Sequence, residues 1–469
     1  MKIDKLQKIR KNKVRKLTRY YIKFNSTPFL LLLVGIMLGA IIGITCVLFQ
    51  ILPDTILACI YASFQSSDHD FTAYASIFLV CGLLASFAIG ITITFAPEAG
   101  GSGIPEIEGA LDHKRPIRWK RVLPVKLLGG ISSLSSGMIL GREGPSIQIG
   151  GNLGKMIADL FFLSKSHAMS LVAAGGAAGL ASAFNAPLAG ILFVLEELRP
   201  QFRYSFLSIK IVSITVISAS VTRCFLVDNL AVFKDLPNYI CPNVGTFYWF
   251  ALFGIIVGVI GYLFNKNIEK FQNFYSAFFK GKLSTALPFI FVVGGCFGII
   301  FVSEQQAAGS GMMSIPLWIT KDQSIQVLLL LLIWRIFGTL LCFGSGIPGG
   351  IFAPSLAIGT LLGALFGTIL GQLGITDISP GIFAIVGMST LFAASVRAPV
   401  TGIILVTEMT NNYEFLLPMM ISTLCATLTA KKMGGKPIYT QILERTLRIA
   451  EEKKHRQIHN ERASNAINS

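Results

Sequence analysis

The segment EGPSIQIGGNLG, from Glu143 to Gly154, decides the fold, because the second half of the chain contains a related segment, FAPSLAIGTLLG, from Phe352. The two segments align without gaps at an offset of 209 residues and share Pro, Ser, Ile, Gly, Leu and Gly at matching positions. Self-similarity at a fixed spacing is the sequence signature of a duplicated structural unit.

Two further pairs of segments keep nearly the same spacing. The tripeptide GSG at residues 101–103 recurs at 309–311, an offset of 208, and NAPLAGILFVLEE from Asn185 matches RAPVTGIILVTEM from Arg397, an offset of 212. Three matches in the same order predict a fold made of two repeats. We expect an N-terminal segment at 1–26, repeats at 27–227 and 246–443, a connector at 228–245, and a C-terminal tail at 444–469.

The composition predicts a membrane protein. Of the 469 residues 53% are hydrophobic and only 14% are charged, whereas charged residues make up about a quarter of a soluble domain. Residues 29–50 are uncharged and long enough to cross a bilayer, and Thr27 and Pro28 form a plausible helix start. A secretory signal peptide has a shorter apolar core, so we expect this segment to be retained as a membrane helix.

The net charge of +16 is concentrated at the two ends of the chain. Residues 1–23 hold ten basic side chains and one acidic one, and the chain from Lys431 onward holds nine basic and four acidic ones. Basic segments beside membrane spans stay in the cytoplasm. We therefore expect cytoplasmic termini and cytoplasmic loops at 113–121 and 199–203, and we expect no nucleic-acid partner.

Motifs for enzymatic chemistry are missing from the sequence. The eight cysteines lack the close pairs of zinc or redox sites, and the five histidines lie in loops or tails. HExxH, GxSxG and P-loop signatures do not occur. The sequence therefore predicts neither a metal site, nor a cofactor, nor an enzyme.

Several apolar segments are short and interrupted by Gly, Pro or a charge. Residues 124–140, 170–180 and 380–392 are expected to be too short for clean membrane spans. Discontinuous helices at matching positions of two repeats indicate a transport site near the bilayer midplane. Packing seams between helices are the alternative interpretation of any single break. Similarity alone leaves open whether the repeats are parallel or inverted.

Three Gly- and Pro-rich breaks precede apolar runs that can be helical: GSGIP at 101–105, GREGP at 141–145 and GIFAP at 350–354. Helix N-termini placed there would offer free N–H groups and partial positive charge, which together bind an anion. Dipolar binding is weak enough to let a conducted ion leave. The breaks thus predict a selectivity filter, which comprises Gly101, Ser102, Gly103, Ile104, Pro105, Gly141, Arg142, Glu143, Gly144, Pro145, Gly350, Ile351, Phe352, Ala353 and Pro354.

These motifs resemble those of the CLC family of chloride channels and proton/chloride exchangers. The resemblance is carried by GGSGIPEIEGAL, GREGPSIQIGGN, FNAPLAGILF, GGIFAPSLAIG and GGKPIY, and it runs from about Phe29 to about Leu443. It implies an all-α polytopic membrane fold with two inverted repeats, a homodimer with one pore per subunit, and a bacterial inner-membrane location. The two cystathionine-β-synthase (CBS) domains of many family members are not expected after Leu443.

The resemblance also implies the chloride ligands, namely the Ser102 hydroxyl, the backbone amides of Ile351 and Phe352, and the Tyr439 hydroxyl. Considered alone, Ser102 is better explained as a helix cap, and only its place within GSGIP favours a chloride ligand. Tyr439 follows the last apolar segment, so on its own it is expected to be an interfacial tyrosine, and only the resemblance assigns it to the chloride site.

Two carboxylates are candidates for proton transfer. Glu143 is followed by glycine and proline in an apolar region, where burying a carboxylate costs free energy unless the group has a function. The alternative interpretation is that Glu143 forms a salt bridge with the neighbouring Arg142. Glu197 follows Glu196 at the end of an apolar helix. On position alone it could be a solvated acid at a helix end. The resemblance implies another role, because in the CLC family the second glutamate of this pair marks exchangers. We therefore expect an H⁺/Cl⁻ antiporter with Glu143 as outer and Glu197 as inner proton-transfer group. A passive chloride channel of the same fold is the alternative function.

Overall fold

The structure is a computed structural model, and it describes residues 29–198, 205–227, 232–233, 236–237, 239–240, 242–375 and 378–467. The expected N-terminal segment at 1–26, the helix start at Thr27 and Pro28, the basic loop at 199–203 and part of the connector lie outside these residues.

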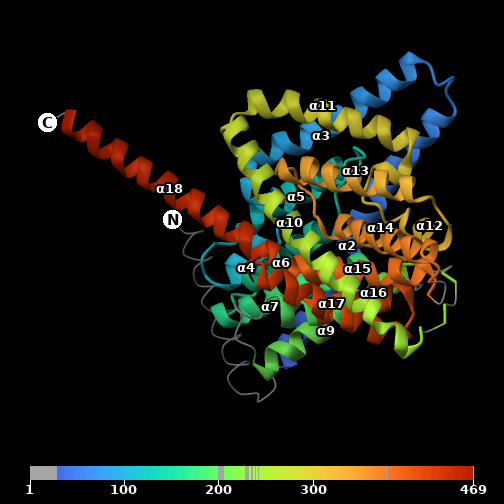
Figure 1. Cartoon of the computed structure of the whole chain (residues 1–469). Coiled ribbons are helices and arrows are strands. Elements are labelled where there is room, and N and C mark those ends of the chain that lie inside the picture. Colours follow the sequence, from blue (N-terminus) through green and yellow to red (C-terminus); the bar gives the residue numbers. More distant parts are fainter. Residues whose placement is uncertain are drawn as a thin grey trace.

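The regular structure of the described part is helical, apart from one isolated β-bridge. The helices are α2 (Phe29–Gln65), α3 (Phe71–Phe95), η1 (Pro97–Ala99), α4 (Ile104–Leu111), α5 (Trp119–Leu134), α6 (Glu143–Leu160), α7 (Lys165–Phe184), α8 (Pro187–Glu196), α9 (Phe206–Leu226), η3 (Val244–Thr246), α10 (Phe247–Phe279), α11 (Leu283–Ser303), η4 (Gln305–Ala307), α12 (Ile315–Thr320), α13 (Ile325–Gly344), α14 (Phe352–Gln372), α15 (Pro380–Val396), α16 (Pro399–Thr410), α17 (Leu416–Lys432) and α18 (Ile438–Ile467). Helix α18 runs without interruption across Leu443 and projects away from the helical body (Figure 1).

Eight helices in the described part are long and apolar enough to cross a bilayer. One of them is α7, so the expectation that residues 170–180 are too short for a span was wrong. Helix α7 is longer because it begins directly after an N-cap at Ser164 and ends at Asn185, which adopts the left-handed conformation. Helices α8, α15 and α16 have 10, 17 and 12 residues and remain shorter than a typical span.

The helix pairings of the first half recur in the second. Helix α2 packs against α9 as α10 packs against α17, and α6 packs against α7 as α14 packs against α15. Helices α3 and α11, which occupy equivalent positions in the two halves, lie side by side (Figure 1). The duplication predicted from three short sequence matches is therefore a duplication of tertiary packing.

Helices α8 and α16 give the relative direction of the two repeats. The Glu408 carboxylate at the end of α16 accepts hydrogen bonds from the amides of Leu188 (3.0 Å) and Ala189 (2.8 Å) in the first turn of α8. The Glu196 carboxylate at the end of α8 accepts them from Val400 (3.2 Å) and Thr401 (2.8 Å) in the first turn of α16. Each helix end meets the start of the other, so these equivalent helices are antiparallel and the repeats are inverted.

Close helix crossings depend on glycine at matching positions. A Cβ on Gly150 would lie 2.0 Å from the Gly175 carbonyl oxygen where α6 meets α7. A Cβ on Gly359 would lie 2.3 Å from the Gly387 carbonyl oxygen where α14 meets α15. The backbones of these helices are therefore in direct contact, as at small-residue interfaces between membrane helices.

Replacing Gly359 by valine is expected to lower the free energy of unfolding by about 1 to 3 kcal/mol or more. The new side chain would collide with the Gly387 backbone, which cannot move aside. Gly371, also in α14, has open space within 4 Å of the position that a Cβ would take, so Gly371→Ala should stabilise the helix by about 1 kcal/mol or less. Thermal unfolding in detergent measures both changes. Equal melting temperatures for the two variants would contradict this account of the crossing.

Candidate anion and proton site

The structure brings the three breaks together at the centre of the two repeats. Gly141 and Gly350 form an antiparallel bridge, in which each backbone N–H donates to the other residue's carbonyl at 2.7 Å. The Gly101 N–H donates to the carbonyls of Gly346 and Ile347, both at 3.1 Å. Segments more than 200 residues apart thus share one backbone network.

A helix begins within each break. Helices α4, α6 and α14 start at Ile104, Glu143 and Phe352, and the first N–H groups of a helix have no acceptor within it. A Cβ on Gly144 would lie only 2.3 Å from the Ser102 hydroxyl oxygen. The start of α6 can therefore approach Ser102 only because residue 144 is glycine. The N-terminal ends of three helices meet within this network, which favours negative charge.

The turn before α4 requires glycine on both sides of Ser102. Gly101 and Gly103 have φ angles of 60° and 83°, and the equivalent Gly309 and Gly311 have φ angles of 64° and 88°. Residues other than glycine rarely adopt these values. The repeated GSG sequence is thus explained by backbone conformation in both halves, whereas the hydroxyl of Ser102 is available for another task.

Ser102 and Tyr439 are two of five buried hydroxyls that have no hydrogen-bond partner in the described part of the chain; the others belong to Ser182, Thr215 and Ser220. Ser102 is 2% exposed and Tyr439 is 0% exposed. An unsatisfied buried polar group costs about 1 to 3 kcal/mol, so a ligand is the expected partner. Ser102 does not cap α4, because the N-cap position is occupied by Gly103. Burial also contradicts the interpretation of Tyr439 as an interfacial tyrosine.

Glu143 is directed at the start of α14. The side chain is 1% exposed, and its Oε2 accepts a hydrogen bond from the Ala353 amide at 3.4 Å. Arg142 forms its ion pair with Asp54 (2.8 Å), so the alternative of a salt bridge between Arg142 and Glu143 is not the pairing found. The Glu143 carboxylate thus lies where an anion would receive backbone N–H groups.

Glu197 lies at the C-terminal end of α8 and is 8% exposed, with no partner for its Oε1 in the described residues. This burial contradicts the alternative interpretation of Glu197 as a solvated acid at a helix end. Glu108 and Glu196 lie within electrostatic range of its carboxyl group. Tyr439 lies within electrostatic range of both Glu197 and Glu143. The charges of both candidate proton-transfer groups thus act on the tyrosine hydroxyl.

Aromatic rings surround the beginning of α14. The Phe352 ring lies 4.4 Å from Phe392, 5.2 Å from Phe184 and 6.3 Å from Phe193, measured between ring centroids. Ile351 and Phe352 are each 1% exposed. Water is thus largely excluded around the amides of these two residues, and electrostatic interactions are stronger there than in bulk solvent.

Two fully buried cations, one beside each GSG turn, were not predicted from the sequence. The Lys126 ammonium group donates to the carbonyls of Gly101 (2.6 Å) and Ala99 (2.9 Å) beside the first GSG turn. The Arg335 guanidinium donates to the carbonyls of Gly309 (3.3 Å) and Ala308 (3.0 Å) beside the second. The signal was present, because each is a lone basic residue in an apolar segment and the two are again 209 residues apart.

The fold and this candidate site define a class of protein: a polytopic membrane transport protein with two inverted repeats, in which the starts of three helices meet at a buried candidate anion site. A family model described as voltage gated chloride channel matches residues 81–431. The chain is 46% identical to the H(+)/Cl(-) exchange transporter ClcA of Vibrio parahaemolyticus, over 91% of this chain and 92% of that protein. It is 46% identical to the protein of the same name in Salmonella arizonae, over 92% of both chains.

Solved structures agree with this assignment. The structure of a slow cyanobacterial Cl⁻/H⁺ antiporter superposes with a TM-score of 0.85 at 35% identity and covers 89% of this chain and 98% of that one. A eukaryotic CLC transporter at 21% identity shares the fold, with a TM-score of 0.73 over 88% of this chain and 73% of that one. The chain therefore belongs to the CLC family, whose members are membrane transport proteins and not enzymes.

Proposed function

We propose that this protein is an H⁺/Cl⁻ exchange transporter that moves chloride and protons in opposite directions across the membrane. The observation that carries the proposal is the position of the Glu143 carboxylate at the start of α14, 3.4 Å from the Ala353 amide. A carboxylate and a chloride ion compete for such a position because both are anions. The identity to relatives named H(+)/Cl(-) exchange transporter supports the same function.

Competition at this position links the two ions. The ionised Glu143 carboxylate accepts hydrogen bonds from the N–H groups at the start of α14. Once protonated, it no longer competes for these N–H groups, and chloride binds there instead. The remaining chloride ligands in this proposal are the Ser102 hydroxyl, the Tyr439 hydroxyl and the amides of Ile351 and Phe352. Both hydroxyls are buried without a partner in the described residues, and that of Ser102 lies against Gly144 at the start of α6, which supports this assignment.

Protons take a separate inner route in this proposal, through Glu197. Its burial, and the absence of a partner for Oε1 in the described residues, support a role as a titratable relay. The alternative of a passive chloride channel requires no such group. A buried acid in a membrane protein is costly without a function, which favours the exchanger.

The proposal extends to assembly and orientation. Helices α8 and α16 are too short to span a bilayer, and their ends carry the partly exposed carboxylates Glu196 and Glu408. Lipid is a poor neighbour for such groups, so a second copy covering this face would form a homodimer with one pore per subunit. We further propose an inner-membrane location, cytoplasmic termini, and the repeat boundaries given above, with repeats at 27–227 and 246–443.

Tyr439→Phe should weaken chloride binding by about tenfold or more, because a hydrogen bond to a charged group contributes about 1.5 to 3 kcal/mol. Calorimetric titration of chloride into purified protein measures the change. Tyr248→Phe is the control, because it also removes a tyrosine hydroxyl, but Tyr248 is 60% exposed and lies outside the proposed site. Unchanged affinity in Tyr439→Phe would remove this hydroxyl from the site.

Proton movement driven by a chloride gradient tests the exchanger function directly. Liposomes containing the purified protein, loaded with chloride and diluted into low-chloride medium, should take up protons from a weakly buffered solution as chloride leaves. Chloride efflux without proton uptake would identify a passive channel instead.

A further inference from the structure

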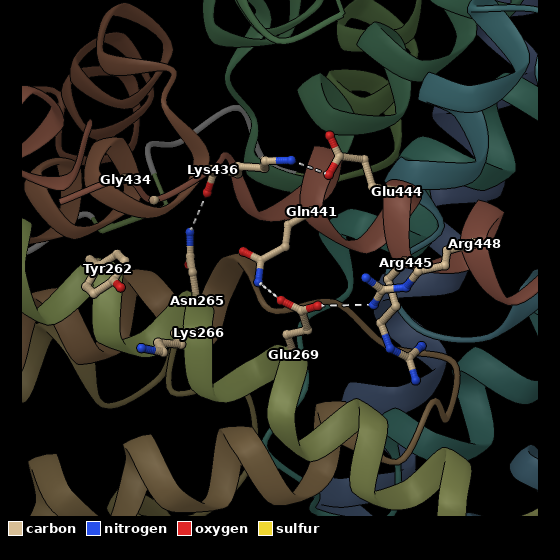
Figure 2. Close-up of a pocket in the computed structure, with 11 residues that line it drawn as sticks. Tyr262, Asn265, Lys266, Glu269, Gly434, Lys436, Gln441, Glu444, Arg445 and Arg448 are labelled. Carbon is tan, nitrogen blue, oxygen red and sulfur yellow. Dashed lines mark hydrogen bonds and ion pairs between the residues drawn. The ribbon is translucent and has the colours of Figure 1, made fainter. Parts of the chain in front are cut away.

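A polar cavity of about 320 Å³ lies away from the anion site, between α10, the start of α18 and the linker that joins α17 to α18 (Figure 2). Gly434, Gly435 and Lys436 of the linker form one wall. Neither the proposed chloride ligands nor the proton-transfer groups line this cavity. Its volume is at the lower end of the range for small-molecule sites.

The cavity is lined by more positive than negative charge. Basic and acidic side chains from α10, α18 and the linker line this cavity; in Figure 2 those of Glu269, Gln441, Lys436 and Glu444 lie close together, and Lys266 extends toward Tyr262. The charged lining residues are Lys266, Lys436, Arg445, Arg448, Glu269 and Glu444, which give a net charge of +2. Such a lining favours an anionic ligand.

The cations differ in how firmly they are held. Arg445 donates to the Gln272 carbonyl at 2.8 Å and so has a fixed position. The ion pairs of Lys436 with Glu444 (2.6 Å) and of Arg448 with Glu269 (3.5 Å) are largely exposed, and exposed pairs contribute only about 0 to 1 kcal/mol. Lys436 and Arg448 can therefore turn toward an anion at little cost.

Lys266 is the cation that a ligand would find available. Within the described part of the chain it forms no ion pair, and its ammonium group lies 5.7 Å from the centre of the Tyr262 ring. The neighbouring Leu263 and the later Phe274 of the same helix are 46% and 59% exposed. A Tyr and a Lys beside exposed apolar residues are typical of the membrane–water interface, where lipid phosphates lie.

We propose that this cavity binds a phosphate group, supplied either by the headgroup of an anionic lipid or by a free phosphate compound. Basic pockets between helices at the membrane interface have this chemistry, and Arg side chains bind phosphate oxygens in pairs. The inference concerns a second anion site and goes beyond the proposed exchange of chloride for protons.

The linker connects this cavity to Tyr439. The Asn265 side-chain amide donates to the Lys436 carbonyl at 3.2 Å and to the Ser395 carbonyl at 2.9 Å. Tyr439 follows Lys436 by three residues. A phosphate held by Lys436 and Lys266 would therefore steady the segment that positions the tyrosine hydroxyl, and its presence should change the rate of chloride transport.

Two arms test the proposal with the purified full-length protein. In detergent, inorganic phosphate is titrated at fixed chloride and binding is measured by calorimetry. In vesicles, chloride flux is compared in phosphatidylcholine with and without phosphatidylglycerol. Each arm uses wild type, the double variant Lys266→Gln/Arg448→Gln and the control Lys270→Gln, an exposed lysine of α10 outside the cavity lining.

Saturable phosphate binding by wild type and Lys270→Gln, weakened about tenfold or more in the double variant, identifies free phosphate as a source. A flux that responds to phosphatidylglycerol in wild type and Lys270→Gln, but not in the double variant, identifies the lipid headgroup. The proposal is overturned if neither probe acts, or if the double variant responds like wild type. Chloride flux of the double variant in pure phosphatidylcholine verifies that it folds, and this flux is the readout that depends on the proposed function.

Discussion

Glu143→Ala is expected to abolish proton transport and to leave a chloride flux that no longer depends strongly on pH. The carboxylate beside the Ala353 amide is the group that exchanges places with chloride, and alanine can neither occupy that position nor carry a proton. The loss of coupling should be complete, because the described structure holds no second carboxylate hydrogen-bonded at the start of α14. Chloride and proton fluxes measured together in liposomes test this prediction.

Glu143→Gln is the matched variant, since glutamine keeps the size of the side chain and imitates the protonated acid. It should behave like alanine in proton transport, which separates loss of charge from loss of volume. Thermal unfolding of both variants should remain close to that of wild type, because the Glu143 carboxylate forms only one long hydrogen bond in the structure. Proton uptake driven by a chloride gradient in either variant would remove Glu143 from the proton path.

Glu197→Gln is expected to stop proton movement while chloride still passes. The substitution removes a titratable group that is 8% exposed, but it leaves the hydroxyls of Ser102 and Tyr439 and the helix N-termini unchanged. In liposomes a chloride gradient should then drive no proton uptake, and the reversal potential should follow chloride alone.

The neighbouring Glu196→Gln is the control for this prediction. Glu196 caps the first turn of α16 through Val400 and Thr401, so its neutralisation should lower the melting temperature, by an amount equivalent to about 0.5 to 2 kcal/mol, and leave proton transport intact. If Glu197→Gln still exchanged protons for chloride at the wild-type ratio, the proposed inner route would be wrong.

The duplicated fold and the meeting of the three breaks could be predicted from sequence because both depend on local signals. A GSG turn needs glycine for its positive φ angles, and a Gly- and Pro-rich break before an apolar run marks a helix start. The inverted direction of the repeats could not be derived in this way. It depends on the reciprocal capping by Glu196 and Glu408, and the sequence does not show that each carboxylate accepts hydrogen bonds from the first turn of the other helix, 204 to 220 residues away.

Other features could not be predicted from the sequence because they depend on tertiary contacts. Glu408 caps the start of α8, and its place at the end of an apolar segment does not reveal this partner. The length of α7 depends on the cap at Ser164 and the left-handed Asn185, neither of which the hydropathy pattern records. The burial of Tyr439 follows from the packing of α18 against α4, which lies more than 300 residues earlier in the chain. Lys126 and Arg335 could have been predicted, because a lone basic residue in an apolar segment is costly unless it has a structural or functional role.

The reversal potential of the wild-type protein in a bilayer, measured with equal chloride on both sides and a pH gradient, tests the central claim most directly. An exchanger couples the two ions at Glu143, so the potential should move away from zero and change sign when the pH gradient is reversed. A potential that stays at zero under both gradients would show that chloride passes alone and would contradict the account.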